Sequence, residues 1–95
     1  MKPLPLPTDV LKDEKAREVL RAFVLCDGRL VTVHLGDAWE HVATWGILLA
    51  DTARQISTVA IQQGNDSPLE EIIEMFNAEV TAPTSEISAA IVQEQ

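Results

Sequence analysis

The sequence predicts a small α+β domain in which a β-hairpin is followed by a long and then a short α-helix (ββαα), with flexible termini. Three observations lead to this fold class. Two runs of strand-forming residues flank Asp27-Gly28, a pair typical of hairpin turns. An apolar stripe at three- and four-residue spacing follows, as in an amphipathic helix; it consists of Val42, Trp45, Leu49, Ala53, Ile56 and Ala60. Ser67-Pro68 then opens a second such stripe.

The length of 95 residues leaves room for one domain, and 46% hydrophobic residues can supply a core. We expect that domain to cover residues 9–82, with a short turn or frayed helix over 9–17. Residues 1–8 are predicted to be a disordered proline-rich tail, because alternating prolines lack amide donors for a regular ladder. Residues 83–95 are predicted to be a disordered or weakly helical acidic tail.

The predicted hairpin covers residues 18–35. If Asp27-Gly28 forms a two-residue type I′ turn, Val24 lies opposite Val31 and one face of the ribbon is almost wholly apolar. That face should meet the core, while the other face carries more apolar residues than a solvated surface needs. The apolar residues of this other face are Val19, Phe23, Leu25 and Leu30.

The long helix is predicted to begin near Asp37, because Asp37 and Glu40 have the spacing of a capping box. It should continue to about Gln63 and stop at Gly64. Gly46 lies inside it and costs about 1 kcal/mol relative to alanine. We therefore expect another backbone to approach closely at Gly46.

The short helix has a strong predicted start, with Ser67 as the N-cap, Pro68 in the first position and Glu70 three residues after the cap. Pro83 should stop it. Glutamates occupy its solvent-facing side. Its predicted buried stripe consists of Leu69, Ile72, Ile73, Phe76 and Val80.

The charge pattern opposes two classes of partner. Seven Lys and Arg against fifteen Asp and Glu give a net charge of −8, and every Lys and Arg lies at or before Arg54. We therefore expect neither nucleic acid nor an anionic membrane as a partner. No apolar run approaches the roughly 20 residues that span a bilayer, and no secretory signal is visible. With Cys26 as the single cysteine, we expect a cytoplasmic protein.

The predicted helices are too few to cover both faces of the hairpin, and this predicts a homodimer. One helical layer covers one face of a two-stranded ribbon, and its edges stay unpaired. A second copy would then cover the interface residues named above, Val19, Phe23, Leu25 and Leu30, either through joined hairpins or through crossed long helices. The alternative is that residues 9–17, or a tail, fold over that face of the same chain.

Several stretches carry a resemblance to a known family. The string Lys15–Arg21, the hairpin after it, Trp39, and the tryptophan-glycine-aliphatic-aspartate run Trp45–Asp51 followed by Ala53-Arg54 look like a family of short, uncharacterised bacterial proteins of unknown function. The resemblance covers about residues 8–82. It implies a bacterial, cytoplasmic, single-domain protein. It implies no catalytic residue and no cofactor, since that family has no assigned activity.

One cluster contains potential metal ligands, namely His34, Asp37, Glu40 and His41. No HExxH or Cys/His zinc pattern is present, and a helix cap with two solvated histidines explains the same residues. Cys26 lacks an oriented base, because the expected register points His34 to the outer face. We expect Cys26 to be a small core-side residue at the end of the strand. We therefore predict no metal, no cofactor and no catalytic residue.

Three residues of the predicted long helix suggest a different role. Asp51 and Arg54 are three positions apart and can pair across one turn, and they could also lie at an interface. Trp39 could line a pocket beside them. The favoured function is a non-catalytic homodimeric protein-interaction module. The alternative is a small-ligand or regulatory binding module with a groove between helix and hairpin near Trp39, Asp51 and Arg54.

Overall fold

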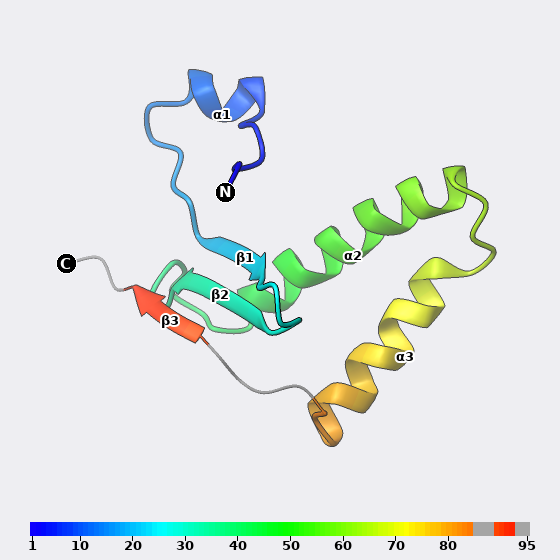
Figure 1. The fold of residues 1–95 in the computed structure, drawn as a ribbon. Coiled ribbons are helices and arrows are strands. Elements are labelled where there is room, and N and C mark those ends of the chain that lie inside the picture. The colour runs from blue at the N-terminus through cyan, green and yellow to red at the C-terminus, as the bar shows by residue number, and fades with distance from the viewer. Residues whose placement is uncertain (85–88, 93–95) are drawn as a thin grey trace.

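A computed structural model describes residues 1–84 and the backbone of residues 89–92. A β-hairpin followed by a long and a short helix confirms the predicted ββαα fold, to which the structure adds a short N-terminal helix and a third strand. In chain order the elements are α1 (Thr8–Lys12), β1 (Leu20–Val24), β2 (Leu30–Leu35), α2 (Thr44–Gln62), α3 (Pro68–Thr81) and β3 (Ala89–Val92) (Figure 1).

The sheet has the strand order β1-β2-β3, with β1 antiparallel and β3 parallel to β2. The sequence does not predict β3, because four residues are too few for a visible alternation and the pairing with β2 joins distant parts of the chain. Of the segment 83–95, expected to be a disordered or weakly helical tail, residues 85–88 and 93–95 lie outside the described residues.

The register of the hairpin differs from the prediction by one residue. Val24 lies opposite Leu30 rather than Val31. A type I′ turn needs positive φ at both Asp27 and Gly28, but of these two only Gly28, at +89°, has it. The connection is therefore a three-residue loop closed by glycine in the left-handed region, and the predicted two-residue turn is wrong.

Hydrogen bonds around the loop stabilise this longer connection. The Leu25 N–H donates to the Arg29 carbonyl, and the Gly28 N–H donates to the Leu25 carbonyl, each at 2.9 Å. The Asp27 carboxylate accepts hydrogen bonds from the Arg29 N–H at 3.1 Å and from its Nε at 2.9 Å. An aspartate that bonds the backbone two residues ahead favours such a turn.

The changed register exchanges the faces of β2. Residues directly opposite each other share a face, so Leu30 lies with Val24, and Val31 lies with Phe23. The expectation that Leu30 shares a face with Phe23 is therefore wrong. Val19, Phe23 and Leu25 are half-buried, whereas Leu30 is exposed.

Helix α2 begins at Thr44, seven residues later than predicted. The preceding segment 36–43 forms turns instead, because Ala38 is buried and its carbonyl accepts a hydrogen bond from Arg17 Nη2 at 2.9 Å. Asp37 is exposed, and the capping box inferred from it does not start the helix. A contact between distant residues thus overrides a local signal.

The other helix ends lie where the sequence places them. Gly64 has φ +97°, and the Asn65 N–H returns to the Ala60 carbonyl, so α2 stops as expected. Helix α3 begins at Pro68 and ends before Pro83. Ser67 is its N-cap residue, but its side chain makes no capping hydrogen bond.

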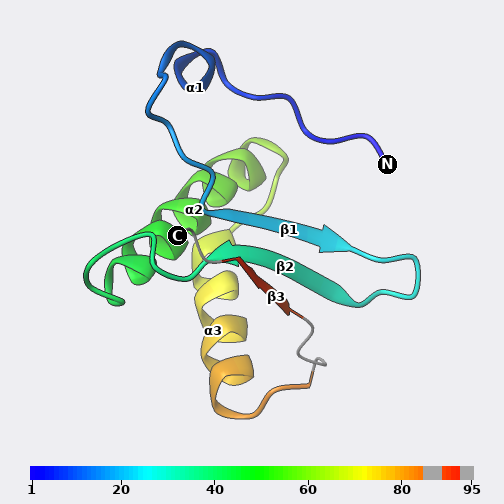
Figure 2. The same cartoon turned by 90° about the vertical axis from the view of Figure 1, so that its left-hand side faces the viewer.

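The helices α2 and α3 contact each other and form a V whose apex points away from the sheet (Figure 1). No Cα atom of either helix lies within 8 Å of a Cα atom in β1, β2 or β3. Figure 2 shows the three strands side by side. Among the described residues, the buried apolar core consists of Leu35 and Ala38, with Pro68 also buried. One chain therefore has little shared core.

Aromatic rings connect α2 to the hairpin. Trp45 meets Trp39 edge to face with ring centroids 5.0 Å apart, and it meets His34 in the same way at 6.0 Å. His34 is therefore half-buried against a helix, and its expected place on a solvated outer face is wrong. Edge-to-face pairs of this kind add stability beyond their buried area.

The N-terminal residues give limited cover to the hairpin. Helix α1 occupies part of the expected turn or frayed helix over 9–17, and no Cα atom of α1 lies within 8 Å of a strand Cα atom. Residues 1–4 and 22–25 line one shallow hollow, so the proline-rich tail lies beside the end of β1. Helix α1 therefore does not seal the outer face.

The ring cluster predicts that Trp45→Ala unfolds the protein at a lower temperature. Removing the indole abolishes its contacts with Trp39 and His34, and large-to-small changes of this kind cost about 3 kcal/mol. Val42→Ala is the control, because Val42 is 81% exposed and its truncation should change stability by less than about 0.5 kcal/mol. Thermal denaturation followed by circular dichroism measures both. Equal melting temperatures for the two variants would contradict this core assignment.

Alanine should have opposite effects on stability when it replaces each of two glycines. Gly28→Ala forces a side chain into φ +89° and should destabilise the hairpin by about 1 kcal/mol. Gly46 has ordinary helical geometry and nothing within 4 Å of an added Cβ, so the expected close backbone is absent there. Gly46→Ala should raise stability by about 1 kcal/mol. Urea titration of both variants checks the signs, and a stabilising Gly28→Ala would contradict the turn.

Candidate functional site

A hollow lies between α2 and α3 in the described chain. It has a volume of about 500 Å³ and is open to solvent. The loop between the helices brings them together in antiparallel fashion, so side chains of α2 face the start of α3. The residues that line it are Asp51, Arg54, Gln55, Ser57, Thr58, Ile61 and Leu69.

An ion pair occupies one wall of this groove. Arg54 Nη1 lies 3.8 Å from Asp51 Oδ1, as their spacing predicts, and the two side chains are 74% and 60% exposed. Such an exposed pair contributes little to stability. In a single chain both groups are solvated, so each is available to a polar ligand or partner at the surface.

Ser57 is a buried groove residue that sequence reasoning missed. It is 5% exposed, and its Oγ has no hydrogen-bond partner, whereas the neighbouring Thr58 hydroxyl donates to the Arg54 carbonyl at 3.1 Å. The available signal was a run of small side chains, Ala53, Ser57 and Ala60, which lets a second helix approach closely. The sequence stripe included the two alanines and omitted the serine between them.

Trp39 lies outside this groove. It packs against Trp45, and it is not among the residues that line the hollow with Asp51 and Arg54. The small-ligand alternative expected Trp39 beside the ion pair. The structure does not place it there. The groove that does exist lies between two helices rather than between a helix and the hairpin.

The possible metal and nucleophile residues are dispersed. Within residues 1–84, no three His, Cys, Asp or Glu side chains are placed to share a metal ion. Cys26 is exposed in the hairpin loop, so its expected core-side position is wrong. His34 lies at the far end of the hairpin ladder, opposite Leu20. Among the described residues, no helix has the length and apolar character needed to cross a membrane.

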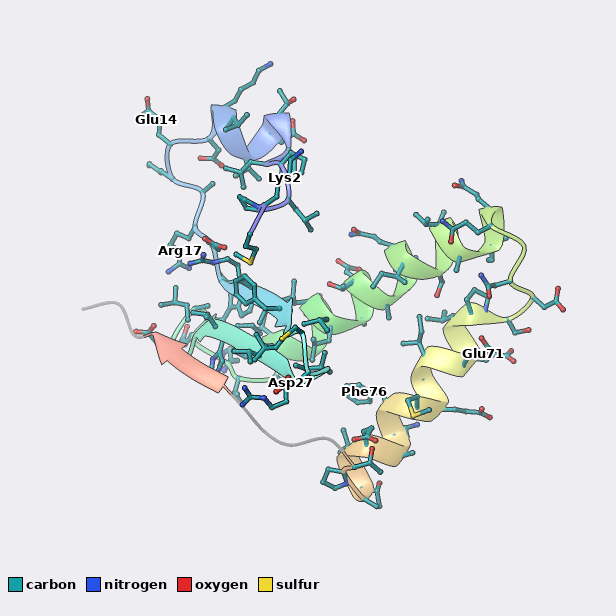
Figure 3. The ribbon with its side chains drawn as sticks, viewed as in Figure 1. Lys2, Glu14, Arg17, Asp27, Glu71 and Phe76 are labelled. Atoms are coloured by element: carbon teal, nitrogen blue, oxygen red, sulfur yellow. The ribbon has the colours of Figure 1, made fainter. Side chains whose placement is uncertain are left out.

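The groove does not account for the many apolar side chains that are exposed on α2 and α3. The helical stripes predicted to be buried are half-exposed, with Leu49 at 44%, Ile56 at 54% and Phe76 at 51%. Phe76 extends from α3 into the open angle between that helix and the hairpin (Figure 3). More than half of the exposed large hydrophobic side chains in the described chain lie on α2 and α3. They are Ile47, Leu49, Ile56, Val59, Ile61, Ile73, Met75, Phe76 and Val80.

The exposed ion pair predicts that Arg54→Ala changes stability by less than about 0.5 kcal/mol, because solvent screens the pair. Thermal denaturation in low and high salt checks this, and Asp51→Ala should behave alike. A loss well above 1 kcal/mol for either variant would show that the pair lies buried in an assembly in solution.

Comparisons with known proteins place the chain in a family. No curated protein matches it. A solved structure named "Structure of a putative pyruvate dehydrogenase from the photosynthetic bacterium Rhodopseudomonas palustrus CGA009" is 42% identical, with a TM-score of 0.73. The match covers 93% of this chain and 92% of that one. A family model described as a domain of unknown function (DUF5076) matches residues 3–84, so the chain belongs to the DUF5076 family.

Proposed function

We propose that this protein is a non-catalytic homodimer that acts as a protein-interaction module. The observation that carries the proposal is the area one chain leaves exposed. Its accessible surface is 8439 Å². A folded monomer of 10.4 kDa exposes about 5,400 Å², so this chain has an excess of about 3,000 Å².

The dimensions support the same conclusion. The radius of gyration is 15.2 Å, whereas a compact chain of 95 residues has about 12 Å. Obligate dimer interfaces bury upwards of about 1,000 Å² on each partner, which the excess can supply. Twofold homodimers are the commonest soluble assemblies, so a second copy of the chain is the partner we propose.

The placement of reactive side chains supports the non-catalytic part of the proposal. A nucleophile needs a base within hydrogen-bond reach, but Cys26 and His34 lie at opposite ends of the hairpin, and His34 packs on Trp45. An exposed lone thiol also suits a compartment that keeps cysteines reduced. We therefore propose a cytoplasmic location.

A small-ligand module is the second candidate function, and one observation favours it. The unpartnered Ser57 Oγ lies in the groove beside Arg54 and Thr58, so a polar ligand there would gain a buried hydroxyl and an exposed guanidinium. The groove is shallow and open, and ligand sites usually enclose most of the ligand surface. The uncovered apolar area therefore favours the dimer.

The proposal predicts twice the 10.4 kDa chain mass in solution. Size-exclusion chromatography with light scattering, at protein concentrations from micromolar to tens of micromolar, measures it. The physical reason is that two copies remove apolar surface that one copy leaves in water. A 10.4 kDa species throughout the dilution series would reject the homodimer.

A further inference from the structure

We infer that the second copy binds along one side of α2, through an antiparallel pairing of the two α2 helices. The contact surface, here termed the α2 stripe, consists of Leu49, Thr52, Ile56 and Val59. The inference rests on the proposed homodimer and adds which surface forms it. It replaces the outer face of the hairpin, around Phe23 and Leu25, as the expected interface.

Exposure separates these two surfaces. On the hairpin, Val19, Phe23 and Leu25 are already half-buried within one chain. On α2, Leu49, Ile56 and Val59 are 44%, 54% and 52% exposed, although each is a large apolar side chain. The helix therefore has more to gain from a partner than the hairpin face has.

The spacing of the α2 stripe is that of a helix-pairing seam. Its members are three, four and three residues apart. This alternation of three and four is the spacing of a heptad repeat, in which two helices stay in contact. Ile56 and Val59 also line a shallow hollow with Ala60. Such a hollow can receive an apolar side chain from a facing helix.

The charges of α2 lie away from this seam. At 100° per residue, Asp51 and Arg54 project from the side of the helix opposite the α2 stripe, where they line the groove facing α3. Each chain has a net charge of −8, so an interface built from charged faces would be repulsive. The uncharged α2 stripe brings two acidic chains together without opposing carboxylates.

An antiparallel arrangement suits the residues best. It places Leu49 opposite Val59 of the second copy, and Thr52 opposite Ile56, so each apolar layer contains different and complementary side chains. A parallel arrangement would set Thr52 against its own copy and would bring both sheets to one end, since each sheet adjoins the start of α2. Antiparallel helix dipoles also attract each other.

The test compares two matched isoleucines on α2. Ile56→Glu puts a carboxylate in the α2 stripe of both copies, and we expect the dimer dissociation constant to rise by about 100-fold or more. Ile47→Glu is the control, because Ile47 is 65% exposed and lies on the opposite side of the same helix. Its dissociation constant should stay within about threefold of the unchanged protein. Sedimentation equilibrium measures both.

The outcomes separate the two proposals. An unchanged protein that stays monomeric overturns the homodimer and this inference together. A dimeric protein whose Ile56→Glu variant also stays dimeric overturns the α2 stripe alone and leaves the homodimer standing. Equal weakening by both substitutions likewise overturns the α2 stripe.

Disulfide cross-linking tests the pairing even if the charged variant fails to fold. With Cys26→Ser in both proteins, an equimolar mixture of Thr52→Cys and Ile56→Cys chains should form a disulfide-linked heterodimer under mild oxidation. Each variant alone should cross-link at least about tenfold more slowly than the mixture. Efficient linking of Thr52→Cys to itself, without the mixed product, would reject the antiparallel register.

Discussion

The apolar surface of α2, which one chain covers only at the two ends of the helix, is the constraint on which the rest of the structure depends. Helix α2 is long for a domain of this size, and it touches the hairpin through Trp45 and touches α3 near the interhelical loop. Between these two ends, Leu49 and Ile56 remain in water. Small domains bury a limited fraction of their surface and are marginally stable, so side chains of this size usually acquire cover.

One residue decides which face of the hairpin meets the helix. Gly28 adopts φ +89° and Asp27 does not, and this lengthens the loop by one residue. Because side chains alternate along a strand, a shift of one residue turns His34 toward Trp45 and Leu30 away from Phe23. The ring cluster that fastens α2 to the sheet is thus a consequence of turn geometry. A local conformational preference here sets a tertiary contact.

Sequence reasoning succeeded where local chemistry decides the structure. Gly64 and Pro68 mark the end of α2 and the start of α3, and Asp51 lies beside Arg54 as its spacing requires. It failed where distant residues compete. The Arg17 contact with the Ala38 carbonyl holds a turn where a capping box predicts a helix. Periodicity also identifies which side of a helix is apolar, but it does not reveal what covers that side. Ile56 and Phe76 were therefore predicted to be buried and are half-exposed.

A rearrangement of α2 and α3 within one chain would leave the α2 stripe exposed. The V between α2 and α3 opens toward the hairpin, and Phe76 extends from α3 into the space between that helix and the hairpin (Figure 3), where a movement of α3 could cover it. Closure would not cover the α2 stripe, because the side of α2 that faces α3 carries Ser57 and Ile61. Ile56 and Val59 lie on another side of the same helix. Motion within one molecule can therefore reduce the exposed apolar surface of α3, whereas the α2 stripe is the surface that the proposed second copy would cover.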